Sequence, residues 1–330
     1  MKYAKWEDLC STYSEEHAIA ALGKNDVISF HLKEGTCEQL HRLDNVLFAK
    51  RPEIRLSVTT IHYDEKPGKH NTYTNKEFEL LAQLKHLRKL SVSIAVKQDF
   101  RSLSIVPQVD DLCVYVGVNT DLCILENFPN ISNLHLSGKF NEVASILKLS
   151  KIQSLSLSGF KDVDFSCLKN LSLKNIYVSS CSAKENFSVM LSGSVEYLTL
   201  SNIKRAENID FIKIATNLRK LYLDEFILPV LPDFSQNKKL TILQINEMHK
   251  LDNVESLITS NIEYLFVLVS SDKVSGTSFA EILSNMKMLK KALMRLMDRN
   301  DKRYNVLKRS LEKQNKADLL ADSMNFFEMQ

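Results

Sequence analysis

Glycine, proline and cysteine are all scarce in this chain of 330 residues. The eight glycines are scattered, and none has the spacing of a phosphate-binding loop, which excludes the common nucleotide-binding motifs. The cysteines lie far apart, include no Cys-x-x-Cys pair and are too few for a disulfide scaffold, so we expect a cytoplasmic protein in a reducing environment. They are Cys10, Cys37, Cys113, Cys123, Cys167 and Cys181.

Long apolar runs are also missing. No run approaches the roughly 20 residues that cross a bilayer, which excludes a membrane-spanning helix. The opening residues carry acidic side chains where a signal peptide would be apolar, so we expect no export by that route. With 44% hydrophobic and 25% charged residues, the chain has the composition of a folded protein with a large core.

Motifs for catalysis and metal binding are absent as well. The sequence has no Gly-x-Ser-x-Gly elbow, no His-Glu-x-x-His and no cysteine–histidine cluster at zinc spacing. The nearest metal-like group is His62, Asp64, Glu65 and His70, and we interpret it as a solvated polar loop because metal ligands must be held rigidly. We therefore expect a protein that is not an enzyme and has no cofactor and no metal.

A regular repeat dominates the rest of the sequence. Its pattern is apolar-x-x-apolar-x-apolar, and from Leu87 to Ile262 successive copies start 21 to 23 residues apart. Because side chains alternate along a strand, the first, fourth and sixth residues of each copy face the core, and the pattern predicts a solenoid of stacked strands. Copies start at Val27, Leu87, Val109, Ile131, Ile152, Leu173, Val195, Leu218, Leu240 and Ile262, with a degenerate copy around Ile54.

These segments resemble leucine-rich repeats over about residues 27–268, as in Leu87-Arg-Lys-Leu90-Ser-Val92 and Leu218-Arg-Lys-Leu221-Tyr-Leu223. The resemblance implies an α/β leucine-rich repeat solenoid, with a curved parallel sheet on the concave face and short helices, 3₁₀ turns and extended segments on the convex face. The sequence departs from the family where an asparagine ladder is usual, so we expect apolar packing there instead. These positions are Gly117, Phe160, Cys181, Ile203, Phe226 and Met248.

The repeat is interrupted near both ends of the chain. Residues 1–26 include a helix pattern with Ser14 at its start and Gly23 at its end, which predicts an N-terminal helical cap. The solenoid is predicted over residues 27–276, with an irregular insertion at about 60–86. Apolar residues at helical spacing from Phe279 to Met297 then predict a C-terminal helical cap or basic helical tail over 277–330, as one stripe or as a hairpin.

Outward-facing residues form columns across successive copies of the repeat. Aromatic side chains gather in these columns toward the C-terminal half, and tyrosine gives rigid contact area plus a hydrogen bond, so we predict a partner-binding surface. The alternative is that aromatics occupy a pleated surface because of their strand propensity. The predicted partner-binding residues are Tyr115, His135, Tyr177, Tyr197, Tyr222, Asp224, Tyr264 and Phe266.

The central column also contains side chains capable of chemistry. We place His31, Cys113 and His135 in it, and a histidine there acts as a general base only beside a carboxylate or a nucleophile. No such partner is evident in the sequence. We interpret the histidines as partner contacts or surface residues, and Cys113 as an unreactive thiol.

Positive charge is concentrated near the C-terminal end, where residues 287–316 hold eleven lysines and arginines against three acidic residues. Such a stretch suits nucleic acid or an acidic membrane surface, but only Tyr304 interleaves with it, so we favour the solvated face of a cap. We predict a non-catalytic module that binds another protein on its concave sheet, as an inhibitor, adaptor or immunity-type protein. The alternative is a nucleic-acid-associated scaffold that uses the basic C-terminal helices.

Overall fold

The computed structural model divides into two compact units, residues 1–168 (unit 1) and 169–330 (unit 2). It describes residues 3–5, 24, 26–34, 36–62, 64–140, 143–161, 166–182, 191–204, 209–269 and 271–321, with the backbone alone at 3–5, 166, 167 and 299. The helical cap predicted at Ser14 to Gly23 lies outside these residues.

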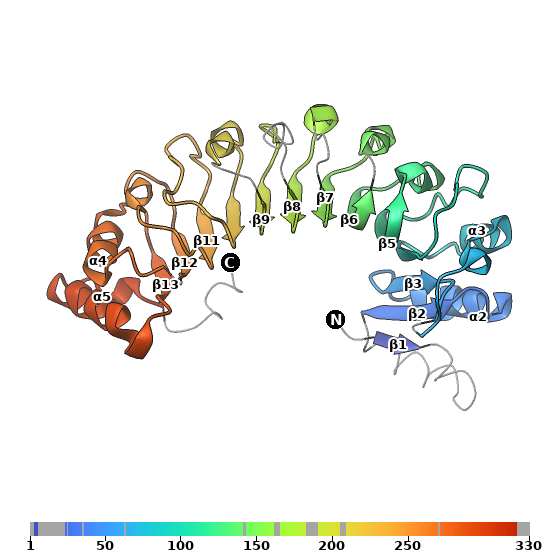
Figure 1. The fold of residues 1–330 in the computed structure, drawn as a ribbon, viewed down its shortest axis with the longest axis horizontal. Coiled ribbons are helices and arrows are strands. Elements are labelled where there is room, and N and C mark those ends of the chain that lie inside the picture. Colours follow the sequence, from blue (N-terminus) through green and yellow to red (C-terminus); the bar gives the residue numbers. More distant parts are fainter. Residues whose placement is uncertain are drawn as a thin grey trace. The chain divides into compact units, whose positions relative to one another are not determined.

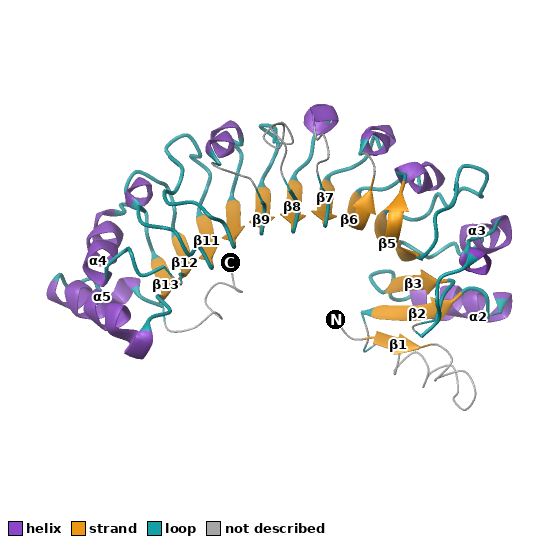
Figure 2. Cartoon of the chain, viewed as in Figure 1, coloured by secondary structure: helices purple, strands orange, loops and turns teal. Residues whose placement is uncertain are grey.

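Unit 1 is a parallel sheet whose strands follow one another in chain order, with return segments on one face (Figures 1 and 2). Its strands are β1 (Tyr3–Lys5), β2 (Val27–His31), β3 (Arg55–Thr59), β4 (Lys89–Ile94), β5 (Asp111–Thr120), β6 (Asn133–Phe140) and β7 (Ser154–Ser158). Its return segments contain α2 (Cys37–Arg42), the π-helix η1 (Leu43–Phe48), α3 (Asn75–Ala82) and the 3₁₀ helices η2 (Lys69–Asn71), η3 (Leu122–Asn127) and η4 (Ala144–Lys148). The 3₁₀ helix η5 (Ser166–Asn170) crosses the boundary between the units.

Unit 2 repeats this arrangement with strands of equal length. Its strands are β8 (Asn175–Ser179), β9 (Tyr197–Ser201), β10 (Lys220–Asp224), β11 (Ile242–Asn246), β12 (Tyr264–Leu268) and β13 (Lys291–Arg295). The helices are α4 (Gly276–Asn285), α5 (Lys302–Lys313) and the 3₁₀ helices η7 (Asp210–Ile214), η8 (Glu255–Leu257), η9 (Arg299–Asp301) and η10 (Ala317–Leu319).

The predicted core positions are confirmed in every copy from Leu87 to Ile262. In the first of these copies Leu87, Leu90 and Val92 are fully buried, and the first, fourth and sixth residues of the later copies are buried as well. Each fourth residue pairs with the fourth residue of the next strand within the unit, as Leu90 does with Leu112. The spacing of the repeat therefore sets the register of the sheet.

A left-handed residue follows the seventh position of many repeats. Gly159 has φ +80°, and Ser180, Asn202, Glu225 and Glu247 have φ between 45° and 52°. In unit 2 the amide of this eighth residue still donates to the next strand, for example from Asn202 to the carbonyl oxygen of Asp224 at 2.9 Å. The chain then turns, and the ninth residue enters the core.

That ninth residue occupies the position where leucine-rich repeats usually carry asparagine. The expected apolar packing is confirmed at five of the six positions named above: Phe160, Cys181, Ile203, Phe226 and Met248 are all buried. Gly117 differs because it is exposed and lies inside the long strand β5.

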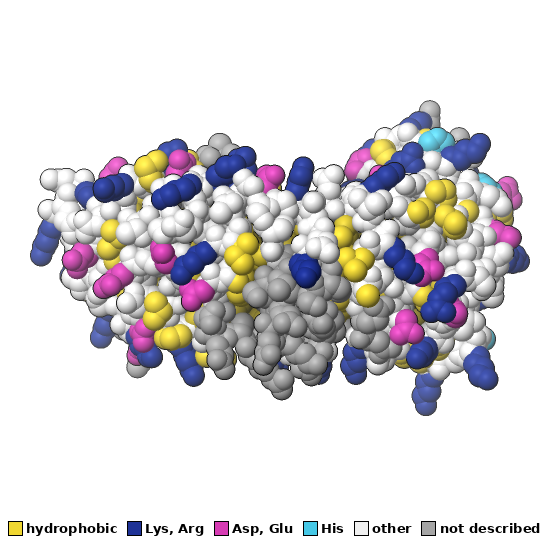
Figure 3. All heavy atoms as spheres, turned by 90° about the horizontal axis from the view of Figure 1, so that it is seen from above, with side chains coloured by type: hydrophobic (Ala, Val, Ile, Leu, Met, Phe, Trp, Pro, Cys, Tyr) yellow, Lys and Arg dark blue, Asp and Glu magenta, His cyan; other side chains and the backbone are white. Residues whose placement is uncertain are grey.

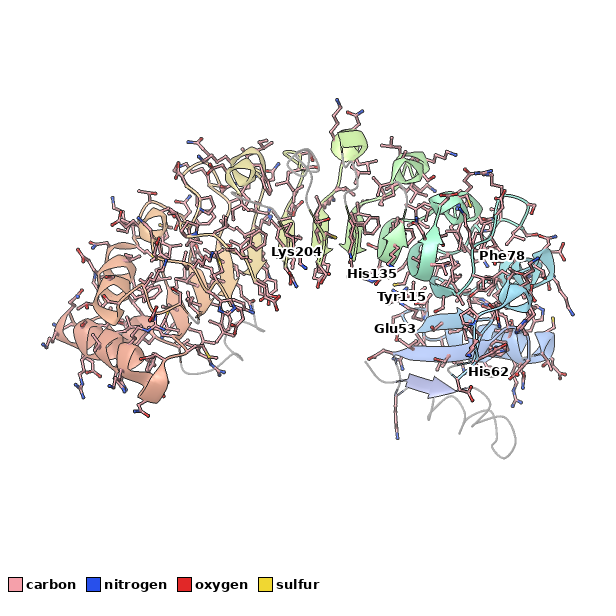
Figure 4. The ribbon with its side chains drawn as sticks, viewed as in Figure 1. Glu53, His62, Phe78, Tyr115, His135 and Lys204 are labelled. Atoms are coloured by element: carbon pink, nitrogen blue, oxygen red, sulfur yellow. The ribbon has the colours of Figure 1, made fainter. Side chains whose placement is uncertain are left out.

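The irregular insertion packs against the sheet of unit 1. Phe78 of α3 is fully buried between this helix and the sheet (Figure 4), and its ring centre lies about 6 Å from those of Tyr73, Phe100 and Phe128. The Tyr73 hydroxyl donates to the carbonyl oxygen of Ser93 at 2.8 Å. We call these four aromatic residues the aromatic cluster.

Two sequence-based expectations are wrong. Register pairs Ile28 with Leu56 and Ser29 with Ser57, so the copy placed at Val27 begins two residues earlier, and His31 belongs to the column of Thr59 instead of the central one. The error arose because Ile28, Phe30 and Leu32 are all apolar and buried, so Phe30 and Leu32 also fit the fourth and sixth positions of a copy that starts at Val27.

The second wrong expectation is the continuous helical stripe after residue 277. Helix α4 ends at Asn285, and β13 then pairs in parallel with β12, beyond the predicted end of the solenoid at 276. The sequence Leu289-Lys-Lys-Ala292-Leu-Met294 is one more copy, hidden by its small fourth residue and by a longer return segment. Helix α5 packs closely on α4, since a Cβ atom at Gly276 would lie 2.2 Å from the Arg303 carbonyl oxygen.

Candidate functional site

The third, fifth and seventh residues of each repeat lie on the face of the sheet opposite the return segments, which we call the outward face. Figure 4 shows Tyr115 and His135 of unit 1 on this face. The predicted partner-binding residues are divided between the units, with Tyr115 and His135 in unit 1 and the others in unit 2. We describe each unit's outward face by itself.

In unit 2, three tyrosines occupy successive strands of the outward face. Register places Tyr177 of β8 beside Thr199, and Thr199 beside Tyr222 of β10, while Tyr197 lies two residues before Thr199 on β9. Neighbouring strands are about 4.8 Å apart, so the three rings lie within reach of a single partner segment. We call Tyr177, Tyr197 and Tyr222 the tyrosine surface.

The tyrosine surface offers accessible rings with fixed positions. Tyr177 is 42% exposed and Tyr197 is 41% exposed, and the Lys220 ammonium lies 6.0 Å from the Tyr197 ring centre. Tyr222 is half-buried, and the Asn246 side-chain amide donates to its hydroxyl at 2.6 Å. Burial raises the pKa of Tyr222, so its hydroxyl is neutral and retains a hydrogen to donate.

Small polar residues surround these rings. The seventh positions of β8 and β9 are Ser179 and Ser201, and the Ser201 hydroxyl donates to the Asp224 carboxylate at 2.9 Å. The predicted contact Asp224 is therefore half-buried and already held by a neighbour. Because serine side chains are short, the tyrosine rings project above this part of the sheet.

The outward aromatic residues of β12 are less accessible than Tyr177 and Tyr197. Tyr264 is half-buried beneath Lys290, whose ammonium lies 5.7 Å from the ring centre and 2.7 Å from the Glu263 carboxylate. Phe266 occupies an outward position but is only 7% exposed. Of the predicted residues in unit 2, Phe266 therefore offers the least surface to a partner.

In unit 1 the outward face is hollowed into a polar recess of about 580 Å³. Serines line much of it, and an ion pair crosses it: Arg55 of β3 reaches over β4 to the Asp111 carboxylate of β5 at 2.7 Å. Arg55 also donates to the carbonyl oxygen of Leu90 at 3.1 Å. The paired charges make this recess rich in hydrogen-bonding groups without a strong net charge.

His135 lies in the polar recess beside a hydroxyl. Its Nδ1 atom is 2.6 Å from the Ser156 Oγ, and its ring centre is 5.5 Å from that of Tyr115. Burial lowers the pKa of His135, and the Arg55 charge lowers it further, so the ring is neutral near pH 7 and shares a hydrogen bond with the Ser156 hydroxyl. Burial also raises the pKa of the Cys113 thiol, which agrees with the prediction that this cysteine is unreactive.

Sequence reasoning missed Arg55 as a site residue. The signal was present, because Arg55, Lys89 and Asp111 share one outward column and carry opposite charges. Arg55 lies in the degenerate copy of the repeat, which hides its place in this column.

The described structure decides the fold class, because repeats of about 22 residues each give one strand, one turn and one return segment, stacked in parallel register. Both units have the leucine-rich repeat fold. The apolar ninth position, the short 3₁₀ return helices and the long insertion before β4 make it an irregular member of that class.

Comparisons with known proteins found similar solved structures and assigned no function. No protein-family model matches the chain, and no curated protein matches it. An internalin from Listeria monocytogenes is similar, with a TM-score of 0.41 and 16% identity over 78% of this chain and 91% of that one. A leucine-rich repeat protein of Leptospira interrogans has a TM-score of 0.41 and 13% identity, over 88% of this chain and 79% of that one.

Among the described residues, no helix combines the length and apolar character needed to span a bilayer.

Proposed function

We propose that this leucine-rich repeat chain is a non-catalytic module that binds a protein partner on the outward face of its sheet. Within that class we propose an inhibitor, adaptor or immunity-type role, in which occupation of the partner's surface is itself the activity. The observation that carries the proposal is the tyrosine surface of unit 2, with two rings more than two-fifths exposed on adjacent strands.

Exposed tyrosines on a rigid sheet are suited to binding. Each ring brings large apolar area with few rotatable bonds, so little conformational entropy is lost when a partner covers it. The ladder holds the backbone of β8 to β10 in place, and Asn246 orients the Tyr222 hydroxyl. Fixed aromatic side chains of this kind dominate the binding energy of many interfaces.

The polar recess of unit 1 supports binding more than catalysis. The Ser156–His135 pair resembles part of a hydrolytic triad, which also needs a carboxylate to orient the other ring nitrogen. Asp111, the carboxylate that lines the recess, is engaged by Arg55. The recess instead suits a polar side chain of a partner, which would hydrogen-bond to its serines, Asn133 and His135.

Affinity capture with paired variants tests the proposal. The tagged full chain is used to capture partners from its own cell lysate at moderate and high salt, with and without nuclease. The Tyr197→Ala/Tyr222→Ala double variant is expected to lose at least about 2 kcal/mol of binding, roughly 30-fold in affinity. Its free energy of unfolding should change by less than about 1 kcal/mol because neither ring is buried in the core.

Ile214→Ala is the matched control. It also removes an exposed apolar side chain from unit 2, but from η7 on the return side. A protein captured equally by wild type and this control, resistant to salt and nuclease, and lost in the double variant supports the proposal. Equal capture by the double variant would contradict the assignment of the tyrosine surface.

The nucleic-acid alternative is weakened by the structure around α5. Arg303 donates to the carbonyl oxygens of Ser271 and Val274, and Lys316 donates to that of Ser284, so part of the basic stretch holds the unit together. Acidic and basic side chains are interspersed on the face seen in Figure 3. Capture of nucleic acid that is lost with salt and nuclease would favour this alternative instead.

A cytoplasmic location remains part of the proposal. The cysteines whose side chains the structure describes, Cys37, Cys113, Cys123 and Cys181, carry free thiols, which suits a reducing compartment. Fractionation of the native cells with a specific antibody tests it.

A further inference from the structure

Two histidines and a glutamate meet at the ends of β2 and β3 in unit 1. Nitrogen atoms of His31 and His62 and a carboxylate oxygen of Glu34 all lie within 4.8 Å of one another. We call His31, Glu34 and His62 the His–Glu–His cluster, and Figure 4 shows His62 beside β2. This grouping differs from the one considered in the sequence, which combined His62 with Asp64, Glu65 and His70.

Backbone turns bring the three side chains together. His31 is the last residue of β2, and the amide of Glu34 donates to its carbonyl oxygen at 3.2 Å, so the chain turns back and places Glu34 near His31. On the next strand, the amide of Ile61 donates to the Thr59 hydroxyl at 3.2 Å, which turns the chain just before His62. The turns that follow the paired strands β2 and β3 therefore bring the three side chains together.

The side chains of the His–Glu–His cluster are already in contact. The imidazole rings of His31 and His62 stack with their centres 4.2 Å apart and their planes 7° apart. The His62 Nε2 atom lies 2.5 Å from a Glu34 carboxylate oxygen.

Neighbouring residues fix the backbone of His62. The Glu65 carboxylate accepts a hydrogen bond from the His62 amide at 3.1 Å and also binds the His70 ring. Asn71 in turn holds the loop, accepting from the Gly68 amide and donating to the Thr60 carbonyl oxygen, both at 2.8 Å.

We propose that the His–Glu–His cluster binds a divalent transition-metal ion of the zinc class. Two imidazole nitrogens and one carboxylate oxygen are donors that zinc accepts, and three protein ligands leave a further position for water. A metal ion lies in the plane of each imidazole that binds it, so the stacked rings tilt apart when the ion enters. His62, whose side chain is 47% exposed, has room for this rotation.

The bound ion joins the ends of two adjacent strands and therefore stabilises the first coils of unit 1. The inference is independent of the protein-binding proposal, because the His–Glu–His cluster shares no residue with the tyrosine surface or with the lining of the polar recess.

Zinc titration of the full chain tests the site. The protein is stripped with a chelator and titrated with ZnCl₂ against a chromophoric competitor, in a Cys37→Ser background because the exposed Cys37 thiol would compete for the metal. We expect one equivalent to bind and to raise the melting temperature. His31→Ala and His62→Ala should each weaken binding by at least about tenfold.

Two further variants keep the test decisive. His249→Ala removes an exposed histidine from unit 2 and should leave zinc binding unchanged. Glu34→Gln preserves the size of an exposed side chain, so it should fold normally yet lose the zinc-dependent rise in melting temperature. Binding below one equivalent, or equal affinity in wild type and all of these variants, would overturn the proposal.

Discussion

The two units differ in where they place their aromatic side chains. Unit 1 buries the aromatic cluster of Tyr73, Phe78, Phe100 and Phe128 between its insertion and its sheet, and its outward face carries serines, an ion pair and the exposed ring of Tyr115. Unit 2 buries aromatic residues in its core as well, but it also presents the tyrosine surface to solvent. The same repeat thus accommodates buried aromatic rings beside the insertion of unit 1 and a row of exposed tyrosine rings on the outward face of unit 2.

The two units also differ in the lengths of their strands. Strands β5 and β6 of unit 1 have ten and eight residues, whereas every strand of unit 2 has five. The polar recess of unit 1 spans strands of unequal length, whereas the tyrosine surface of unit 2 lies on strands of equal length. The outward side chains, and not the fold, decide what each face can bind.

The largest loss of stability is expected for a substitution at the centre of the aromatic cluster. Phe78→Ala removes a fully buried ring with three aromatic neighbours and should lower the free energy of unfolding by about 4 kcal/mol, measured by urea denaturation. Phe78→Leu, which keeps most of the volume, should cost less than about 2 kcal/mol. If Phe78→Ala lowered the free energy of unfolding no more than the tyrosine double variant of unit 2 does, the aromatic cluster would not stabilise unit 1 as its burial indicates.

An intermediate loss of stability is expected when the ion pair in the polar recess is broken. Asp111→Ala leaves the mostly buried Arg55 guanidinium without its carboxylate partner, which should cost about 2 kcal/mol after allowing for partial exposure. Asp99→Ala, which breaks the exposed pair with Arg101 in the same unit, is the control and should cost less than about 1 kcal/mol. Equal costs in urea denaturation would mean that the recess does not depend on this pair.

The smallest effects are expected at the left-handed eighth positions, with opposite signs in the two units. Gly159→Ala in unit 1 should lower stability by about 1 kcal/mol, because alanine is strained at φ +80° and its Cβ would lie 3.3 Å from the Gly138 carbonyl oxygen. Glu225→Gly in unit 2, where φ is 52°, should leave stability unchanged or raise it by up to about 1 kcal/mol. Thermal melts of both variants provide the measurement, and a loss of stability in Glu225→Gly would contradict the assignment of strain there.

The core of the fold was predictable because its determinants are local and periodic. A buried residue at positions one, four and six needs only the neighbouring coil, so the register from Leu87 to Ile262 followed from the spacing of apolar residues. The strand at β13 was missed because Ala292 is a weak hydrophobic signal and because its copy starts 27 residues after the previous one.

The sites were less predictable because they depend on pairs that skip a strand or meet across turns. Arg55 reaches Asp111 over the intervening strand β4, and no pattern within one repeat signals that contact. The His–Glu–His cluster was missed for a related reason, since the register error at Val27 placed His31 in the wrong column. Exposure could not be predicted either, as the contrast between Tyr197 and Phe266 shows.

Because a turn at the eighth position ends each strand, the position of an insertion or deletion decides whether it alters the outward face. Each strand is aligned by its own core residues and ended by its own turn, so the number of residues in the following return segment has no influence on which side chains face outward. Start-to-start spacings of 21 residues between Ile131 and Ile152 and 27 between Ile262 and Leu289 coexist in this chain. In-frame insertions or deletions of a few codons between strands therefore preserve the set of outward-facing side chains, whereas loss of a single codon within a strand turns the following outward side chains of that strand toward the core.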